Sequence, residues 1–277
     1  MIHEHEIPTG SRLYVASCAK QKREFENSAA CILEKANFTE IVTPFFSYHQ
    51  NDVVPEENLI KVADNNNKTF SLRSDSSIDI VRLATKRLEK VQNLFYIQPI
   101  FRYPSSEFYQ IGAESIESLK LEDIISLSTD ILSSIKKEPI LQLSNIKIPK
   151  LLAKKFKLNI DVFKNAEIDK LFDLKVEWVS ALVYASSLEA LEDIIATYKS
   201  IDADIVKEIK KLIDIAHKIE YNNIKLTPIY FSELMFYKDL YFRLFEGNKT
   251  YGLGGVYEID NKTCTGFSLY TDRILGR

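Results

Sequence analysis

Phe101-Arg102-Tyr103 and Phe108-Tyr109-Gln110-Ile111-Gly112-Ala113-Glu114 decide how this chain is expected to fold. Both segments are rich in aromatic or β-branched residues, which is typical of β-strands. The turn formers Pro104-Ser105-Ser106 stand between them. The pattern therefore predicts two antiparallel strands, over 94–101 and 108–111, joined by a short turn.

Three polar side chains of this hairpin are expected on one face of the sheet. Side chains alternate between the two faces of a strand, so Gln110 and Glu114 point the same way, and Arg102 joins them from the other strand. A bound amino acid needs a cation for its carboxylate and acceptors for its ammonium group. These residue types together predict an amino-acid site. The plainer alternative is a structural ion pair between Arg102 and Glu114 or Glu107.

The N-terminal half alternates between helical and extended patterns. Apolar residues recur every three or four positions between 11 and 36, which predicts a helix that buries Phe25, Ala29, Ile32 and Leu33. The patterns that follow predict a strand over 38–44, a loop or hairpin tip over 54–67, a strand over 69–72, and a helix over 75–88 with Asp75 or Ser76 as N-cap.

The C-terminal half contains a long helical block. A helix is expected over 122–135, and residues 148–222 contain no glycine and are rich in helix formers. One apolar stripe of this block is formed by Ile205, Ile209, Leu212, Ala216 and Ile219. Aromatic residues and glycines then indicate strands over 229–275. We predict an α+β fold, an antiparallel sheet flanked by helices, with a helical insertion at 148–222.

The composition narrows the classes of function. With 45% hydrophobic and 27% charged residues, the chain is expected to be a soluble globular protein. A net charge of -3 and a pI of about 5.9 give no broad basic field for nucleic acid. The three cysteines form no CxxC pair, and His3 and His5 lack a third ligand, so neither disulfides nor a metal are expected. Without a signal peptide or an apolar run that spans a membrane, the protein is expected in the cytoplasm.

The hairpin segments resemble motif 2 of the class II aminoacyl-tRNA synthetases, specifically the histidyl enzyme, in which F-R-Y-E precedes F-H-Q-F-G-V-E. Leu72-Arg73-Ser74-Asp75-Ser76-Ser77 is similar to the L-R-P-E-G-T segment that holds the histidine ammonium group in that family. Motif 1 is matched by the first helix running into Val42-Thr43-Pro44, and motif 3 by residues 265–273. The resemblance covers most of residues 7–275 and implies one class II synthetase-like domain over 1–277.

Four departures from the family pattern concern activity. Pro104 replaces the glutamate of F-R-Y-E, and the loop that contacts ATP and tRNA is reduced to a few residues. Met235 stands where the R-G-L-D-Y-Y signature has its arginine, and Val256 replaces the arginine of G-G-R-Y-D. Removing one preorganised donor can lower a rate by ~100- to 1,000-fold. Aminoacyl-adenylate formation is therefore not expected, and no catalytic residue is assigned.

The chain ends at Arg277, directly after motif 3, so no anticodon-binding domain is expected. A synthetase-like domain of this kind resembles the regulatory subunits of ATP phosphoribosyltransferase, the first enzyme of histidine biosynthesis. The resemblance implies a protein without cofactor or chemistry of its own, which activates a short-form catalytic subunit that binds ATP and phosphoribosyl pyrophosphate. It also implies a contribution to feedback inhibition by histidine, and a homodimer within a larger hetero-oligomer, a hetero-octamer in that family.

The resemblance assigns roles to six residues. The candidates for binding a histidine-like ligand are Asp75, Ser77, Arg102, Gln110 and Glu114. Arg102 is assigned the carboxylate, Asp75 and Gln110 the ammonium group, and Glu114 a supporting contact or the imidazole. Arg273 is interpreted as a remnant of the nucleotide site, or as a plain helix-surface pair with Asp272.

Two other functions stay open at this point. A stand-alone amino-acid:AMP ligase would use the same pocket, with Arg102 and Arg273 as its best support, and histidine-dependent exchange of labelled pyrophosphate into ATP would reveal it. A tRNA- or ribosome-associated paralogue is opposed by the acidic pI and the short motif 2 loop, and a gel shift with deacylated tRNA would test it. The sequence does not distinguish histidine in the old amino-acid pocket from histidine at a subunit interface.

Overall fold

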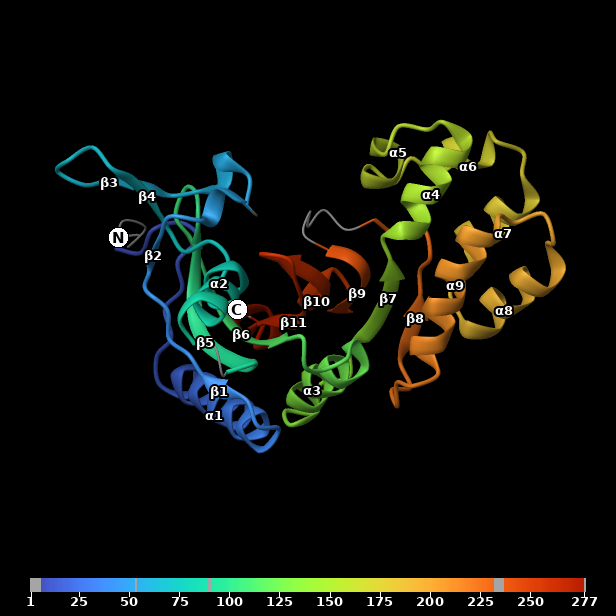
Figure 1. The fold of residues 1–277 in the computed structure, drawn as a ribbon. Helices are drawn as coiled ribbons and strands as arrows, with labels where there is room; N and C mark the ends of the chain where they lie inside the picture. The colour runs from blue at the N-terminus through green and yellow to red at the C-terminus, as the bar shows by residue number, and fades with distance from the viewer. Residues whose placement is uncertain (1–5, 53, 89–90, 232–236, 277) are drawn as a thin grey trace.

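The computed structural model describes residues 6–52, 54–88, 91–231 and 237–276, and its framework is one large sheet flanked by helices (Figure 1). The eight strands stand in the order β1-β5-β6-β11-β10-β9-β7-β8. Their bounds are β1 (Thr39–Glu40), β5 (Asn93–Arg102), β6 (Ser106–Ile116), β7 (Ile140–Asn145), β8 (Ile224–Leu226), β9 (Tyr237–Glu246), β10 (Lys249–Ile259) and β11 (Lys262–Tyr270).

The predicted α+β class is confirmed, but the sheet is mixed rather than wholly antiparallel. The two edge pairs, β1 with β5 and β7 with β8, are parallel, and the pairs between them are antiparallel. Parallel neighbours need a long crossover, because the chain must return from the end of one strand to the start of the next. The helices between β7 and β8 form such a crossover. The parallel edge therefore follows from where the helical block is inserted.

The helical block expected over 148–222 contains six helices, which stack beyond the β7–β8 edge of the sheet (Figure 1). Its longest helix, α9, buries the predicted stripe at Ile205, Ile209 and Leu212. The six helices are α4 (Lys147–Phe156), α5 (Asp161–Lys164), α6 (Ile168–Phe172), α7 (Glu177–Tyr184), α8 (Leu188–Thr197) and α9 (Ala203–Ala216).

Helices cover both faces of the sheet, as the alternation along β5 shows. Phe95 belongs to the large hydrophobic cluster that contains residues of α1 (Ser17–Lys35) and α3 (Leu121–Ser133). Tyr96 faces the other way and packs in a second cluster with α2 (Ser77–Arg87). The face of the hairpin that was predicted to carry the polar residues is the α2 face, because it holds the even-numbered positions of β5.

Two predicted boundaries in the N-terminal part are wrong. The first helix begins at Ser17 instead of residue 11. The strand expected over 38–44 pairs only over Thr39–Glu40. Beyond it, the carbonyl groups of Thr43 and Pro44 accept hydrogen bonds from the Arg73 side chain at 2.8 and 3.2 Å. These carbonyls bond to a buried cation instead of a neighbouring strand.

A small second sheet and three short helical segments complete the described structure. The small sheet has the order β2-β4-β3, with β2 (Phe46–Ser47), β3 (Lys61–Ala63) and β4 (Thr69–Leu72), and β4 was predicted. The hairpin of β3 and β4 projects from the body (Figure 1). Two 3-10 turns, η1 (Gln50–Asp52) and η2 (Glu56–Asn58), precede it, and α10 (Thr271–Ile274) follows β11.

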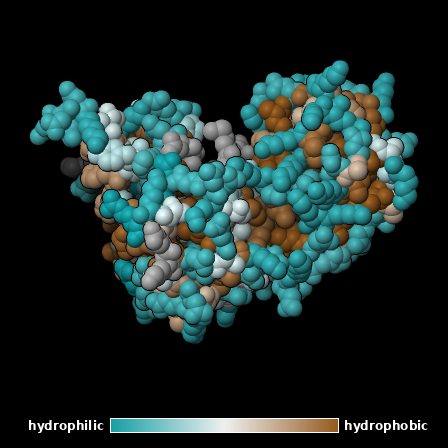
Figure 2. Space-filling view, viewed as in Figure 1, coloured by the Kyte–Doolittle hydropathy of each residue, from teal (hydrophilic) through white to brown (hydrophobic). Residues whose placement is uncertain are grey.

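The surface is mainly hydrophilic in the view of Figure 2, and hydrophobic residues show where β7 meets the helical block. They also show on the side of that block that faces the notch between the two lobes of the molecule. In the part of the chain that the structure describes, no helix combines the length and the apolar character needed to cross a membrane.

Candidate functional site

The five side chains predicted to bind a ligand line one small cavity of about 30 Å³. They come from α2, from the segment before it, and from β5 and β6, and β9, β10 and β11 complete the wall. The lining residues are Asp75, Ser77, Arg102, Gln110, Glu114, Tyr237, Leu253, Tyr257, Gly266, Phe267, Ser268 and Tyr270. The five candidates therefore lie together, and their binding role stays a prediction. We call this space the polar cavity.

The register of the hairpin explains how the sequence brings these groups together. Arg102 pairs with Ser106, and Gln98 pairs with Gln110 in the antiparallel ladder of β5 and β6. Residues that pair in this way share a face of the sheet. Glu114 follows Gln110 by four positions and lies on the same face. The common face predicted for Arg102, Gln110 and Glu114 is confirmed.

Glu114 is the centre of a hydrogen-bond network in the polar cavity. The hydroxyl groups of Ser77 and Tyr257 both donate to its carboxyl. Gly266 lies next to it on β11, where an added Cβ would be 1.9 Å from Glu114 Oε2, so glycine leaves the room that the carboxyl occupies. Burial raises the pKa of Glu114 to about 8, and near neutral pH this carboxyl is therefore largely protonated.

Arg102 and Gln110 carry polar atoms that the protein leaves without a partner, and Asp75 lines the same cavity. Burial raises the pKa of Asp75, and the positive charge of Arg102 opposes that rise. Arg102 Nε and Gln110 Oε1 are buried atoms without a hydrogen-bond partner. Because buried polar atoms in folded proteins nearly always have partners, these two mark positions where a ligand can complete the set.

The plainer alternative, a structural ion pair between Arg102 and Glu114 or Glu107, is wrong. Among the described residues Arg102 makes no ion pair with Glu114 or Glu107, and Glu114 accepts from Ser77 and Tyr257 instead. The charge that Arg102 faces is the one on Asp75. A cation, two carboxyls and an amide thus surround one space, which is a set that can hold an amino acid.

The polar cavity is smaller than an amino acid requires. A volume of about 30 Å³ holds about one or two water molecules. Three bulky tyrosines, Tyr237, Tyr257 and Tyr270, line its wall. An amino acid can therefore enter only when side chains of the wall move outward.

Sequence reasoning missed these tyrosines as part of the site. Tyr257 lies in Gly254-Gly255-Val256-Tyr257-Glu258, a segment noted only for its lost arginine. Strand alternation places Leu253 and Tyr257 on one face, and both line the polar cavity. Tyr96 belongs to the same region, and its hydroxyl lies 2.6 Å from Ser268 Oγ. Alternation along residues 253–257 was the signal that could have identified Tyr257.

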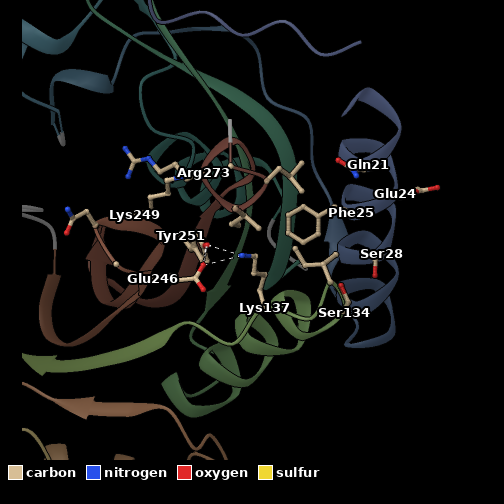
Figure 3. Close-up of a pocket in the computed structure, with 16 residues that line it drawn as sticks. Gln21, Glu24, Phe25, Ser28, Ser134, Lys137, Glu246, Lys249, Tyr251 and Arg273 are labelled. Carbon is tan, nitrogen blue, oxygen red and sulfur yellow. Dashed lines mark hydrogen bonds and ion pairs between the residues drawn. The ribbon is translucent and has the colours of Figure 1, made fainter. Parts of the chain in front are cut away.

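Arg273, the predicted remnant of a nucleotide site, lines a separate cavity of about 900 Å³ among α1, the end of α3, the β9–β10 turn and α10 (Figure 3). Its guanidinium group points away from the cluster of Lys137, Glu246 and Tyr251 in that cavity (Figure 3). The guanidinium carbon lies 4.4 Å from the centre of the Tyr270 ring, a cation–π contact. Arg273 is thus held by an aromatic ring, and contact with a nucleotide stays a prediction.

The alternative prediction, that Asp272 and Arg273 form an ion pair on the helix surface, is wrong because Asp272 is buried. Its carboxyl accepts hydrogen bonds from the Tyr14 hydroxyl and, at 2.7 Å, from the backbone N–H of Tyr109. Asp272 therefore ties the N-terminal segment and β6 to α10.

Among the described residues, the positions that depart from the synthetase pattern carry no cationic side chain. Pro104 lies in the turn between β5 and β6, and Val256 is partly buried against the large hydrophobic cluster. Met235 lies outside the described residues, as do His3 and His5. Within the described ranges, no three His, Cys, Asp or Glu residues are grouped so that they could hold a metal ion.

Comparison with known proteins identifies close relatives over the full length. The family model described as histidyl-tRNA synthetase matches residues 14–274. An ATP phosphoribosyltransferase regulatory subunit from Wolinella succinogenes is 38% identical over 99% of this chain and 96% of its own length. A protein of the same name from Helicobacter hepaticus is 35% identical over 99% of this chain and 98% of its own length.

Solved structures show the same fold at lower identity. An ATP phosphoribosyltransferase regulatory subunit/histidyl-tRNA synthetase from Bacillus halodurans aligns with a TM-score of 0.83 at 17% identity, covering 99% of this chain and 83% of that chain. A chain of the ATP phosphoribosyl transferase (HisG:HisZ) complex from Thermotoga maritima aligns with a TM-score of 0.68 at 16% identity, covering 90% and 97%. The class II synthetase-like fold is thereby confirmed, and the full-length similarity shows that this chain belongs to the histidyl-tRNA synthetase-like family of ATP phosphoribosyltransferase regulatory subunits.

Proposed function

We propose that this protein is the non-catalytic regulatory subunit of a short-form ATP phosphoribosyltransferase. It activates the catalytic subunit, which binds ATP and phosphoribosyl pyrophosphate, and it contributes to feedback inhibition by histidine. The observation that carries the proposal is the full-length similarity to two regulatory subunits. The polar cavity supports it, because its groups suit an amino acid better than a nucleotide.

The charges of the polar cavity oppose adenylate chemistry. Arg102 is the one cation among the described residues of its wall, and it faces the Asp75 carboxyl. Transfer at a phosphoryl group relies on several preorganised cations or donors around the developing charge. The wall offers one arginine beside two carboxyls, of which Glu114 is largely protonated near neutral pH, so a single cation stands where that chemistry uses several. This arrangement favours binding without chemistry.

The proposed ligand of the polar cavity is histidine. Arg102 would bind its carboxylate, Asp75 and Gln110 would accept from its ammonium group, and Glu114 would support the wall or contact the imidazole. The unpartnered Arg102 Nε and Gln110 Oε1 support these roles. Because the cavity now holds only about 30 Å³, binding would be coupled to an outward movement of its wall, and such a movement is what a regulatory subunit can transmit to a partner.

Assembly is the second part of the proposal. The protein would form a homodimer within a hetero-oligomer with the catalytic subunit, with the hetero-octamer as the expected stoichiometry. Native mass spectrometry of the mixed subunits measures this directly. A mixture in which the two proteins keep their separate masses at micromolar concentration would contradict the assembly.

Reconstitution tests the function. The short-form catalytic subunit from the same source is assayed for formation of phosphoribosyl-ATP with increasing amounts of this protein, and then with increasing histidine. We expect activity to rise until a fixed molar ratio is reached, and to fall with histidine. A catalytic subunit that gains nothing at saturating amounts of this protein would remove the proposal. Robust histidine-dependent pyrophosphate exchange by this protein alone would establish the ligase alternative instead.

A further inference from the structure

A third cavity, of about 250 Å³, lies between the β7–β8 edge of the sheet and the helical block. It is lined by β7, by α5, α6 and α7, and by residues 227–231, and among described residues it shares none with the polar cavity. Its walls are mainly apolar, formed by residues such as Val162, Phe163, Leu171, Val183, Ile229 and Phe231. We call this space the insertion cavity.

One wall of the insertion cavity carries a buried amide that is only half satisfied. Gln142 of β7 is 8% exposed, and its Nε2 donates to Thr227 Oγ1 at 2.9 Å. Thr227 Oγ1 also lies 2.6 Å from Ser144 Oγ. Gln142 Oε1 is buried and has no hydrogen-bond partner. The amide could also be rotated by about 180°, so that its oxygen faces Thr227 and its nitrogen takes the unpaired position. In either orientation one polar atom of the side chain has no hydrogen-bond partner.

The charge around the insertion cavity favours a neutral ligand. Lys164 is the one charged side chain among its described lining residues, and Lys164 Nζ pairs with Asp161 Oδ1 at 3.0 Å. Lys164 is exposed, so its charge is solvated as well as paired. The cavity thus offers mainly apolar walls, with Gln142, Thr227 and Tyr230 as its uncharged polar side chains, which is the usual composition of a small-molecule site.

The volume sets the size of the ligand. An apolar cavity of about 150 Å³ binds benzene, so about 250 Å³ accommodates an aromatic ring with a substituent. We propose that the insertion cavity binds a small neutral aromatic molecule that carries one hydroxyl or amide group. The ring packs against the apolar walls, and the polar group hydrogen-bonds to Gln142. A hydroxyl or an amide serves either orientation of Gln142, because both groups donate and accept.

Titration of the full-length protein with phenol and with toluene tests the proposal. The two probes share a ring and nearly the same size, but only phenol can hydrogen-bond. We expect saturable binding of phenol at one site per chain by calorimetry, and binding of toluene that is weaker by about 10-fold or more, since pairing a buried polar group discriminates by roughly that factor. Absence of saturable phenol binding up to the millimolar range would overturn the proposal.

Two variants locate the binding. Gln142→Leu removes the amide and is expected to abolish the preference for phenol over toluene, whereas Gln21→Leu, at an exposed glutamine of α1, should leave it unchanged. Val183→Phe adds bulk to the wall and should weaken the binding of both probes at least 10-fold. This second variant tests the site even if Gln142→Leu fails to fold. Thermal melting confirms that each variant is folded. A folded Gln142→Leu protein that keeps the full preference, or a folded Val183→Phe protein that binds phenol normally, would place the probe elsewhere and refute the assignment.

Discussion

Glu114 on β6 and Tyr257 on β10 are hydrogen-bonded to each other although β11 lies between their strands. The contact passes over Gly266, which pairs with Glu114 in the ladder of β6 and β11. Ser77 brings α2 to the same carboxyl. One buried acid on β6 is therefore joined to β10 across β11, and to α2, at the wall of the polar cavity.

Gly266→Ala is expected to destabilise the protein by about 1–3 kcal/mol, because the new methyl group would meet the Glu114 carboxyl and the Ala113 carbonyl. Urea unfolding gives the free energy of unfolding. The double variant with Glu114→Ala is the control, since it removes one of the two clashing groups and should cost clearly less than the sum of the single changes. Strictly additive costs would show that Glu114 is not what excludes the methyl group.

The Glu114 carboxyl should make stability depend on pH. Burial raises its pKa from an ordinary value of 4.5 to about 8 in the folded protein. Between these values the folded state binds more protons than the unfolded state, so the free energy of unfolding falls as the pH rises from 4.5 to about 8. The glutamine of a Glu114→Gln variant cannot ionise. The decrease in its free energy of unfolding over this pH range should therefore be smaller, by an amount on the order of a few kcal/mol.

Urea midpoints measured across this pH range check the effect. Glu117→Gln is the matched control, because Glu117 is exposed and pairs with Lys262 at the surface. Its pH profile should follow the unmodified protein. If the Glu114→Gln protein also follows it, Glu114 does not titrate in this window.

Two arginines near the hairpin should differ sharply in their effect on stability. Arg73 is fully buried and donates hydrogen bonds to the backbone carbonyls of Thr43, Pro44 and Pro99, so Arg73→Met leaves several buried acceptors unpaired. We expect a loss on the order of 3 kcal/mol or more. Arg102→Met should cost much less, because Arg102 Nε has no hydrogen-bond partner to lose. Unfolding by urea compares them, and equal costs would contradict the distinction.

Arg102→Met should instead weaken feedback by histidine. Loss of a charged hydrogen-bonding partner lowers affinity by roughly 10- to 100-fold, and the histidine concentration for half inhibition of the reconstituted enzyme should rise accordingly. Activation at zero histidine should be unchanged. Arg23→Met, at an exposed arginine of α1, serves as the control for charge loss. Unaltered inhibition in the Arg102→Met complex would place histidine at a site other than the polar cavity.

The predictable part of the structure is the part that depends on local periodicity. Arg102, Gln110 and Glu114 could be placed on one face because strands alternate and the turn between them is short. The parallel edges could not be foreseen, since β1 and β8 have only two and three residues and carry little pattern. The small size of the polar cavity could not be foreseen either, because residues of its wall such as Tyr257 are more than 100 positions from the hairpin.

The distinction between Arg73 and Arg102 was likewise invisible in the sequence. Both follow an apolar residue at the end of an extended segment, and both lie in stretches that resemble the synthetases. What separates them is the carbonyl groups that surround Arg73, which belong to residues brought near it only by the fold.

The crossover between β7 and β8 limits how this protein can be shortened. Leu141 pairs with Ile224 and Leu143 with Leu226, so the block leaves the sheet beyond one end of this strand pair and re-enters at the other. A short linker that replaced α4–α9 would have to run back along the whole of β7, which a two-residue turn cannot do. Engineered deletions must therefore keep a connection of about a dozen residues or give up β8 as well.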